Sequence, residues 1–199
     1  MRYQSHWNRI VLALLFGLAA SASEAHTGHG TSGLYEGLAH PFGLDHLLAM
    51  VAVGIWSVSA LPAKQTWWGP AVFMSSLIVS AVAGAIGVAL PFLENLISLS
   101  VVLFGAMLVL SRFQTNAVVG LLLIAVAAAM HGLAHGAESP ESSFKVYALG
   151  FLMTSAALHF GGVALGMSLK RYAPNTVSWV NTALGLVFGG TGLYLLIQI

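Results

Sequence analysis

The stretch His40-Pro-Phe-Gly-Leu-Asp-His46, which continues into Leu47-Leu-Ala-Met50, stands at the head of a long apolar run. Pro41 cannot donate a backbone hydrogen bond, and its ring disfavours a helical conformation at the residue before it. We therefore expect a helix that is kinked here, or that begins properly near Phe42, with backbone carbonyl groups freed beside the proline. Gly43 leaves room for a neighbouring group.

The same stretch carries two imidazoles and a carboxylate, from His40, Asp45 and His46, in a chain with only 7% charged residues. Titratable side chains at membrane depth are costly, and they usually mark an ion or substrate path. These three residues are therefore candidate metal ligands.

The composition indicates a membrane protein. Hydrophobic residues make up 58% of the 199 positions, and the mean hydropathy is +0.87. Seven basic and six acidic residues are too few to solvate so apolar a globule, and no basic cluster suggests a nucleic-acid partner. Cysteine is absent, which excludes disulfides and thiolate metal sites.

Residues 1–25 are typical of a secretory signal peptide. Arg2 and Arg9 precede an apolar core, Ile10 to Ala20, that is short for a membrane span. We expect cleavage after Ala25, with Ala22 as a competing site, and an uncleaved anchor stays open. The mature chain, 26–199, would then form a single domain.

A short polar arm, 26–33, would follow the cleavage site. It carries His26 and His29 among Gly, Ser and Thr residues. It is either an external metal-collecting arm or a solvated linker.

Six apolar stretches follow, and their continuous hydrophobicity favours helices over a barrel. The expected fold is all-α, a polytopic bundle of six transmembrane helices. The stretches are Gly33–Ser59, Trp68–Leu90, Leu96–Leu110, Ala117–Gly136, Ser142–Ser168 and Thr176–Ile197.

The loop charges predict the topology. With an external N-terminus, the basic loop residues face the cytosol, as the positive-inside rule requires, and the C-terminus is external too. These residues are Lys64, Arg112, Lys170 and Arg171, whereas Glu94, Glu138 and Glu141 would lie outside, with Lys145 at the start of the fifth stretch as the one basic exception. Trp56, Trp67 and Trp68 would form an aromatic belt at the cytosolic face. We expect a multi-pass protein of the bacterial inner membrane.

A second polar cluster lies at the outer end of the fourth stretch. His131 and His135 stand at i and i+4 on one helix face, a spacing that suits a single metal ion, and Glu138 lies at i+7. Because this cluster has a similar depth to the first, we expect the two to converge.

His159, deeper in the fifth stretch, is either an onward ligand or a packed histidine bonded to a carbonyl group. Imidazole with carboxylate and no thiolate suits borderline divalent ions such as nickel, cobalt, zinc or copper. No organic cofactor is expected.

The motifs His40-Pro-x-x-Gly-x-Asp-His46 and His131-Gly-x-Ala-His135-Gly-x-Glu138 resemble those of the HupE/UreJ family, over essentially the whole mature chain. These small membrane proteins are associated with nickel-dependent hydrogenase or urease maturation. The resemblance implies secondary transport of nickel, with cobalt or copper in related members, and it implies that the motif residues form the metal path.

The leading hypothesis is therefore a metal permease directed toward the cytosol, and not an enzyme. No phosphate-binding Walker motif is present, so ATP hydrolysis is not expected. An intramembrane zinc hydrolase and a non-transporting sensor or maturation scaffold are the alternatives. Homo-oligomer formation and contact with cytosolic maturation proteins stay open.

Overall fold

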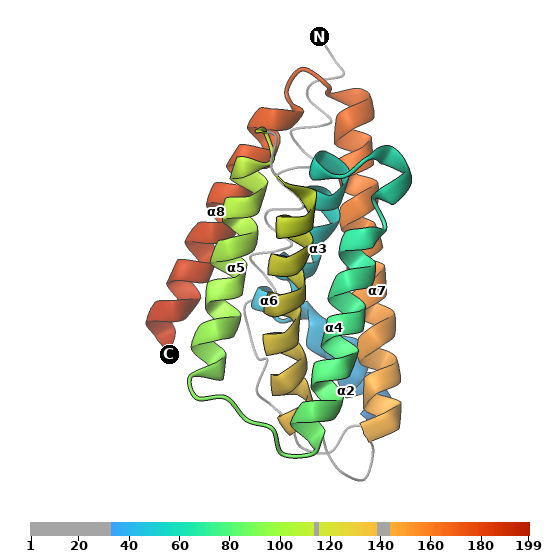
Figure 1. Ribbon diagram of the computed structural model, residues 1–199, viewed down its shortest axis with the longest axis vertical. Coiled ribbons are helices and arrows are strands. Elements are labelled where there is room, and N and C mark those ends of the chain that lie inside the picture. The colour runs from blue at the N-terminus through green and yellow to red at the C-terminus, as the bar shows by residue number, and fades with distance from the viewer. Residues whose placement is uncertain (1–32, 114–115, 139–143) are drawn as a thin grey trace.

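The computed structural model describes residues 33–113, 116–138 and 144–199, which form a bundle of helices with no strand in these ranges (Figure 1). The predicted signal peptide and the arm with His26 and His29 lie outside the described residues, as does Glu141. In chain order the elements are α2 (Gly33–Ala39), the short 3-10 helix η1 (His40–Phe42), α3 (Leu44–Ala60), η2 (Ala63–Gln65), α4 (Trp68–Ala85), α5 (Leu93–Leu110), α6 (Ala117–Glu138), α7 (Phe144–Tyr172) and α8 (Val177–Gln198).

The all-α membrane bundle predicted from the sequence is confirmed. In the described part of the chain, five helices are long and apolar enough to cross a membrane, and the number is six if the bent pair formed by α2–η1 and α3 counts as one span. The second span ends at Ala85 rather than at Leu90. Gly87 and Phe92 both have a positive φ, so the chain turns between α4 and α5 where the sequence suggested continued helix.

The first span is broken at Gly43, where η1 and α3 meet at an angle of 67°. Gly43 is extended, with ψ of 139°, and its N–H donates to the carbonyl oxygen of His40 at 3.0 Å. The predicted kink is confirmed, but the helix resumes at Leu44 instead of Phe42. The His40 carbonyl is not freed, because the turn uses it.

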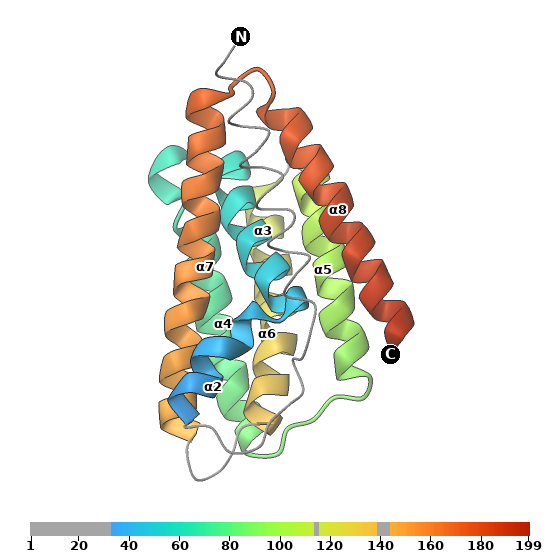
Figure 2. The same cartoon turned by 180° about the vertical axis from the view of Figure 1, so that it is seen from behind.

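Helix α3 forms the centre of the bundle, and it contacts α4, α5, α7 and α8 (Figure 1 and Figure 2). Most of its residues from His46 to Val58 are buried. Around it, α4 packs along α6, α5 along α8, and α2 against the first half of α7. A polar residue such as His46, near the N-terminal end of α3, is therefore enclosed by other helices rather than by lipid.

Glycines permit the close approach of these helix pairs, as is usual in membrane bundles. At each interface, an added Cβ atom would collide with backbone of the facing helix. The glycines that show this are Gly37 and Gly150 between α2 and α7, Gly54 and Gly162 between α3 and α7, Gly84 and Gly136 between α4 and α6, and Gly105 and Gly185 between α5 and α8.

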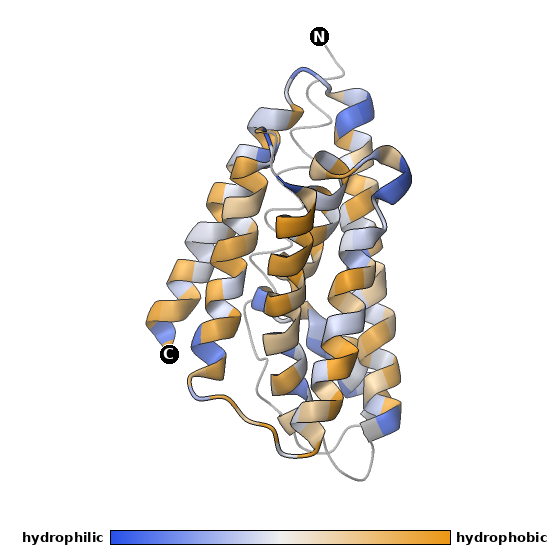
Figure 3. Cartoon of the chain, in the orientation of Figure 1, coloured by the Kyte–Doolittle hydropathy of each residue, from blue (hydrophilic) through white to orange (hydrophobic). Residues whose placement is uncertain are grey.

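The outer surface of the bundle is largely apolar, as lipid contact requires (Figure 3). Side chains such as Val79, Leu122 and Leu186 are more than half exposed on different helices. Trp67 and Trp68, at the start of α4, are also exposed, in agreement with the predicted aromatic belt. Trp56 is only 3% exposed. Trp56 packs instead over Gly120 of α6, so the expectation that it faces the interface was wrong.

The two ends of the bundle differ in charge. The C-terminal ends of α3, α5 and α7 lie together with the η2 loop, and this end carries Lys64, Arg112, Lys170 and Arg171. The opposite end carries Glu94 at the start of α5 and the C-terminus of α6. The helix directions thus bring four basic residues to one end, while Lys145 at the start of α7 lies at the other end with Glu94. Helix α8 ends on that second side, where α2 begins (Figure 1).

Gly162 and its neighbour Gly161 form a matched pair for testing the packing of α3 against α7. A methyl group at Gly162 would collide with the Val51 backbone, whereas one at Gly161 meets nothing within 4 Å. We expect Gly162→Ala to destabilise the fold by about 1–3 kcal/mol through overpacking. Gly161→Ala should be neutral or stabilise it by up to about 1 kcal/mol, since alanine favours helix. Thermal unfolding in detergent measures both, and equal midpoints would contradict this interface.

Candidate metal centre

Three histidines from separate parts of the chain meet inside the bundle. His40 of η1, His46 of α3 and His135 of α6 each offer one ring nitrogen, and these nitrogens lie within 4.8 Å of one another. The ring centroids are 5.3 Å apart for His40 and His46, and 4.6 Å apart for each of the other two pairs. His46 and His135 are buried, and His40 is half-buried. The arrangement can hold one metal ion through imidazole nitrogens.

The break at Gly43 and two aromatic side chains of α7 position His40. Because the chain turns through η1, the His40 ring faces the side of α3 that carries His46. On its other side it lies 6.0 Å from the ring of Tyr147 and 5.9 Å from that of Phe151. Phe151 also packs against His135, with 4.4 Å between ring centroids. Aromatic contacts from α7 thus support two of the three rings.

Asp45 orients His46. Its Oδ1 atom lies 2.7 Å from Nδ1 of His46 and also accepts the backbone N–H of His46 at 2.9 Å. A carboxylate can only accept, so the charge of Asp45 beside Nδ1 favours a proton on that nitrogen and a lone pair on Nε2. That Nε2 atom is within hydrogen-bonding distance of Nε2 of His135. Asp45 therefore contacts the candidate ligand His46, as carboxylates commonly contact ligating histidines in metal sites, and is not itself one of the three candidate ligands.

His131 lies beside this cluster but is held by a different helix. Its ring centroid is 4.9 Å from that of His46, and the side chain is completely buried. Nε2 of His131 is hydrogen-bonded to Oγ of Ser100 on α5 at 2.8 Å. Of the i,i+4 pair, the structure therefore brings only His135 into the three-histidine group.

His159 of α7 lies outside the cluster. Its Nδ1 donates to the carbonyl oxygen of Ser155 at 2.7 Å, and its ring packs 4.5 Å from that of Phe73 on α4. Glu138 is the last residue of α6, and its side chain lies outside the described part of the structure.

Sequence reasoning missed Ser100, Phe73, Tyr147 and Phe151, which support these histidines. Ser100 offers a weak signal, because it is a buried hydroxyl within the apolar run of α5. The three aromatic residues offer no such signal, because aromatic residues also occupy ordinary lipid-facing and core positions.

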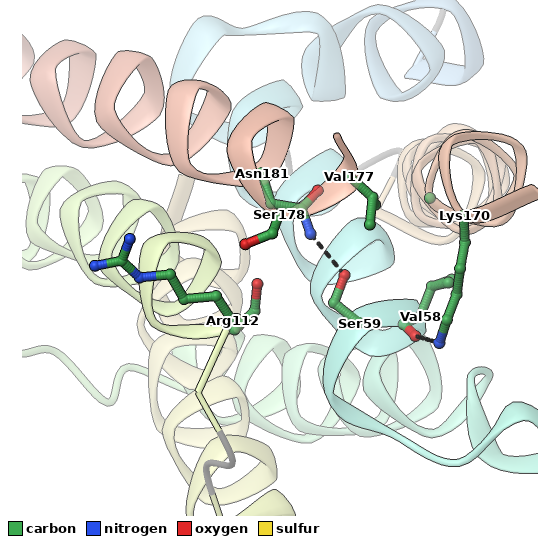
Figure 4. A pocket seen from close by; sticks show the side chains of 9 residues that line it. Val58, Ser59, Arg112, Lys170, Val177, Ser178 and Asn181 are labelled. Atoms are coloured by element: carbon green, nitrogen blue, oxygen red, sulfur yellow. Dashed lines mark hydrogen bonds between the residues drawn. The ribbon is translucent and has the colours of Figure 1, made fainter. Parts of the chain in front are cut away.

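A cavity of about 110 Å³ lies at the opposite, basic end of the bundle (Figure 4). Lys170 and Arg112 line it, with Lys170 Nζ donating to the carbonyl of Val58 at 3.4 Å and Asn181 donating to Ser59 Oγ at 2.8 Å. Two cationic side chains make this cavity unsuitable for a metal cation. The histidine cluster is therefore the better candidate centre.

Comparison with known proteins agrees with the motifs. The family model described as HupE / UreJ protein matches residues 12–195. Protein HupE of Rhizobium leguminosarum bv. viciae is 35% identical over 188 residues, which cover 89% of this chain and 97% of that protein. No solved structure matches. The bent first span and the paired histidine motifs thus occur in a chain that belongs to the HupE/UreJ family of membrane proteins.

Proposed function

We propose that this chain is a secondary permease that carries a divalent transition-metal ion across the inner membrane toward the cytosol. The observation that supports it is the group of three histidines, His40, His46 and His135, held inside membrane-spanning helices. Buried ionisable residues at such a depth are expensive unless they serve a path. The ion is the cargo, so the site must bind it and then release it.

The donor set indicates the class of ion. Neutral imidazole nitrogens suit nickel, cobalt, zinc and copper, whereas they bind magnesium or calcium poorly. Asp45 makes Nε2 of His46 a better donor by accepting the proton on Nδ1. We propose nickel first, on the resemblance of both motifs to the family associated with nickel enzymes. Cobalt, copper and zinc are the competitors.

In this proposal the ion enters from the acidic end of the bundle, after the signal peptide 1–25 has been removed. His26 and His29 would collect it there, and Glu138 would lie at the mouth of the site. Transport would be driven by membrane potential, by proton coupling or by trapping in the cytosol.

We also propose that the chain is not an enzyme. The hydroxyl that contacts His131, next to the three-histidine centre, is that of Ser100, and it already donates to the carbonyl of Ile97. It is thus occupied rather than poised as a nucleophile.

Removing a ligand tests the permease. His40→Ala and His135→Ala should each lower nickel uptake by cells more than about tenfold, because the remaining nitrogens bind the ion weakly. Phe42→Leu is the control, since Phe42 lies in the same turn but is half exposed. Uptake of radioactive nickel at equal protein level is the measurement. Undiminished uptake by both histidine variants would contradict the proposal.

Asp45→Asn separates the charge of the carboxylate from its geometry. The asparagine oxygen can still accept the proton of His46 Nδ1, so the ring keeps its orientation but loses the nearby negative charge. We expect nickel affinity to fall about 10–100-fold, as for other residues behind a metal ligand. Calorimetric titration of purified protein measures it, and an unchanged Kd would assign Asp45 no part in binding.

Acid should weaken nickel binding. A protonated imidazole has no lone pair for the metal, so protons compete with the ion for the half-buried His40. Affinity should therefore be highest at neutral pH and fall at least about tenfold between pH 7.5 and 5.5. Titrations in detergent at both values test this, and a flat profile would argue against imidazole ligation.

A further inference from the structure

Two histidines that the three-histidine centre does not use lie in the interior of the bundle. His131 of α6 and His159 of α7 are both 0% exposed. Both rings pack against the same aromatic side chain, Phe73 of α4, at centroid distances of 5.8 and 4.5 Å. His159 is close to the middle of α7, so it lies deeper than the centre formed at η1.

The hydrogen bonds of His131 determine which of its nitrogens holds the proton. Ser100 has a single hydroxyl hydrogen, and this is donated to the carbonyl oxygen of Ile97 at 2.6 Å. The hydroxyl must therefore accept from His131, which places the imidazole proton on Nε2. Nδ1 is left with a lone pair, buried and without a hydrogen-bond partner among the described residues.

The same reasoning applies to His159. A carbonyl oxygen only accepts, so the bond to the Ser155 carbonyl places the proton on Nδ1. Nε2 then carries a lone pair that is also buried and has no partner within the described ranges. The Ser155 hydroxyl, fully buried one turn earlier, is likewise without a partner there.

These three atoms require an explanation, because buried polar atoms are nearly always hydrogen-bonded. Hydrogen bonding within the bundle explains the N–H group of each ring, which donates to Ser100 or to the Ser155 carbonyl. It does not explain the other ring nitrogen, His131 Nδ1 or His159 Nε2. A bare imidazole nitrogen is a ligand for a borderline divalent cation. The His131 ring lies 4.9 Å from that of His46, and the rings of His131 and His159 both pack against Phe73, so the two histidines follow the three-histidine centre toward the interior of the bundle.

We propose that His131 Nδ1 and His159 Nε2 form an inner binding station that receives the metal ion from the three-histidine centre. This inference rests on the proposed function. The transfer is a ligand exchange, in which a bond from the ion to a nitrogen of the centre breaks as a bond to His131 forms. The ion then passes to His159, with the Ser155 hydroxyl as an additional oxygen ligand. No electron is transferred and no proton must leave, because both receiving nitrogens are already bare.

Two substitutions remove the receiving nitrogen while keeping the hydrogen bond that anchors the side chain. In His159→Asn, the amide nitrogen takes the place of Nδ1 and can donate to the Ser155 carbonyl, but nothing replaces Nε2. In His131→Gln, the amide nitrogen takes the place of Nε2 and can donate to Ser100, while the ring nitrogen Nδ1 is lost. Either variant tests the station if the other fails to fold.

The experiment compares nickel affinity, by calorimetry, with nickel flux into proteoliposomes loaded with a chelating dye. We expect both variants to bind nickel with a Kd within about twofold of wild type, because the outer centre is intact, and to lose at least about tenfold in flux. Wild-type flux in both variants would overturn the inner station. A parallel loss of affinity in both would also overturn it, since the residues would then belong to the outer centre.

His40→Ala separates this inference from the permease itself. If His40→Ala abolishes flux while His159→Asn and His131→Gln transport normally, the proposed function stands and the inner station fails. If wild-type protein binds nickel but moves none, the permease proposal fails and the station fails with it.

Discussion

The break between η1 and α3 is the constraint on which the metal centre depends. Pro41 disfavours a continued α-helix at His40, and Gly43 adopts an extended conformation where the span bends by 67°. The turn closes on itself through the Gly43 N–H and the His40 carbonyl, so these two backbone groups satisfy each other inside the membrane span. A straight helix would carry His40 away from His46, and the three nitrogens would not meet.

A second constraint is that three of the four buried imidazoles in the described ranges lie against one acceptor on their own or a neighbouring helix. Asp45 orients His46, the Ser100 hydroxyl orients His131, and the Ser155 carbonyl orients His159. Each bond holds one nitrogen in its protonated form and leaves the other with a lone pair. Glycines at the helix crossings contribute, because they let α3 approach α7 and α4 approach α6 closely.

Much of the fold follows from local patterns. Continuous apolar runs predict the spans, and Pro41 predicts the break, because both depend only on the residue itself and the bilayer around it. Predictions from the sequence were wrong where contact with another part of the chain determines the position of a residue. Trp56 looks like an interfacial residue by position, yet it is buried over Gly120. The turn at Gly87 and Phe92 ends α4 early, although the residues there are apolar enough to continue a span.

The sequence by itself determined that this is a polytopic helical protein with two histidine motifs at one level of the membrane, because hydrophobicity and helical spacing are local properties. Only the tertiary structure decided which histidines meet. His131 and His135 share one helix face, yet Ser100 of α5 binds the first, while His40 and His46 face the second. That division depends on how α3, α5 and α6 are rotated against one another, and helix rotation is set by packing between distant segments rather than by any single one.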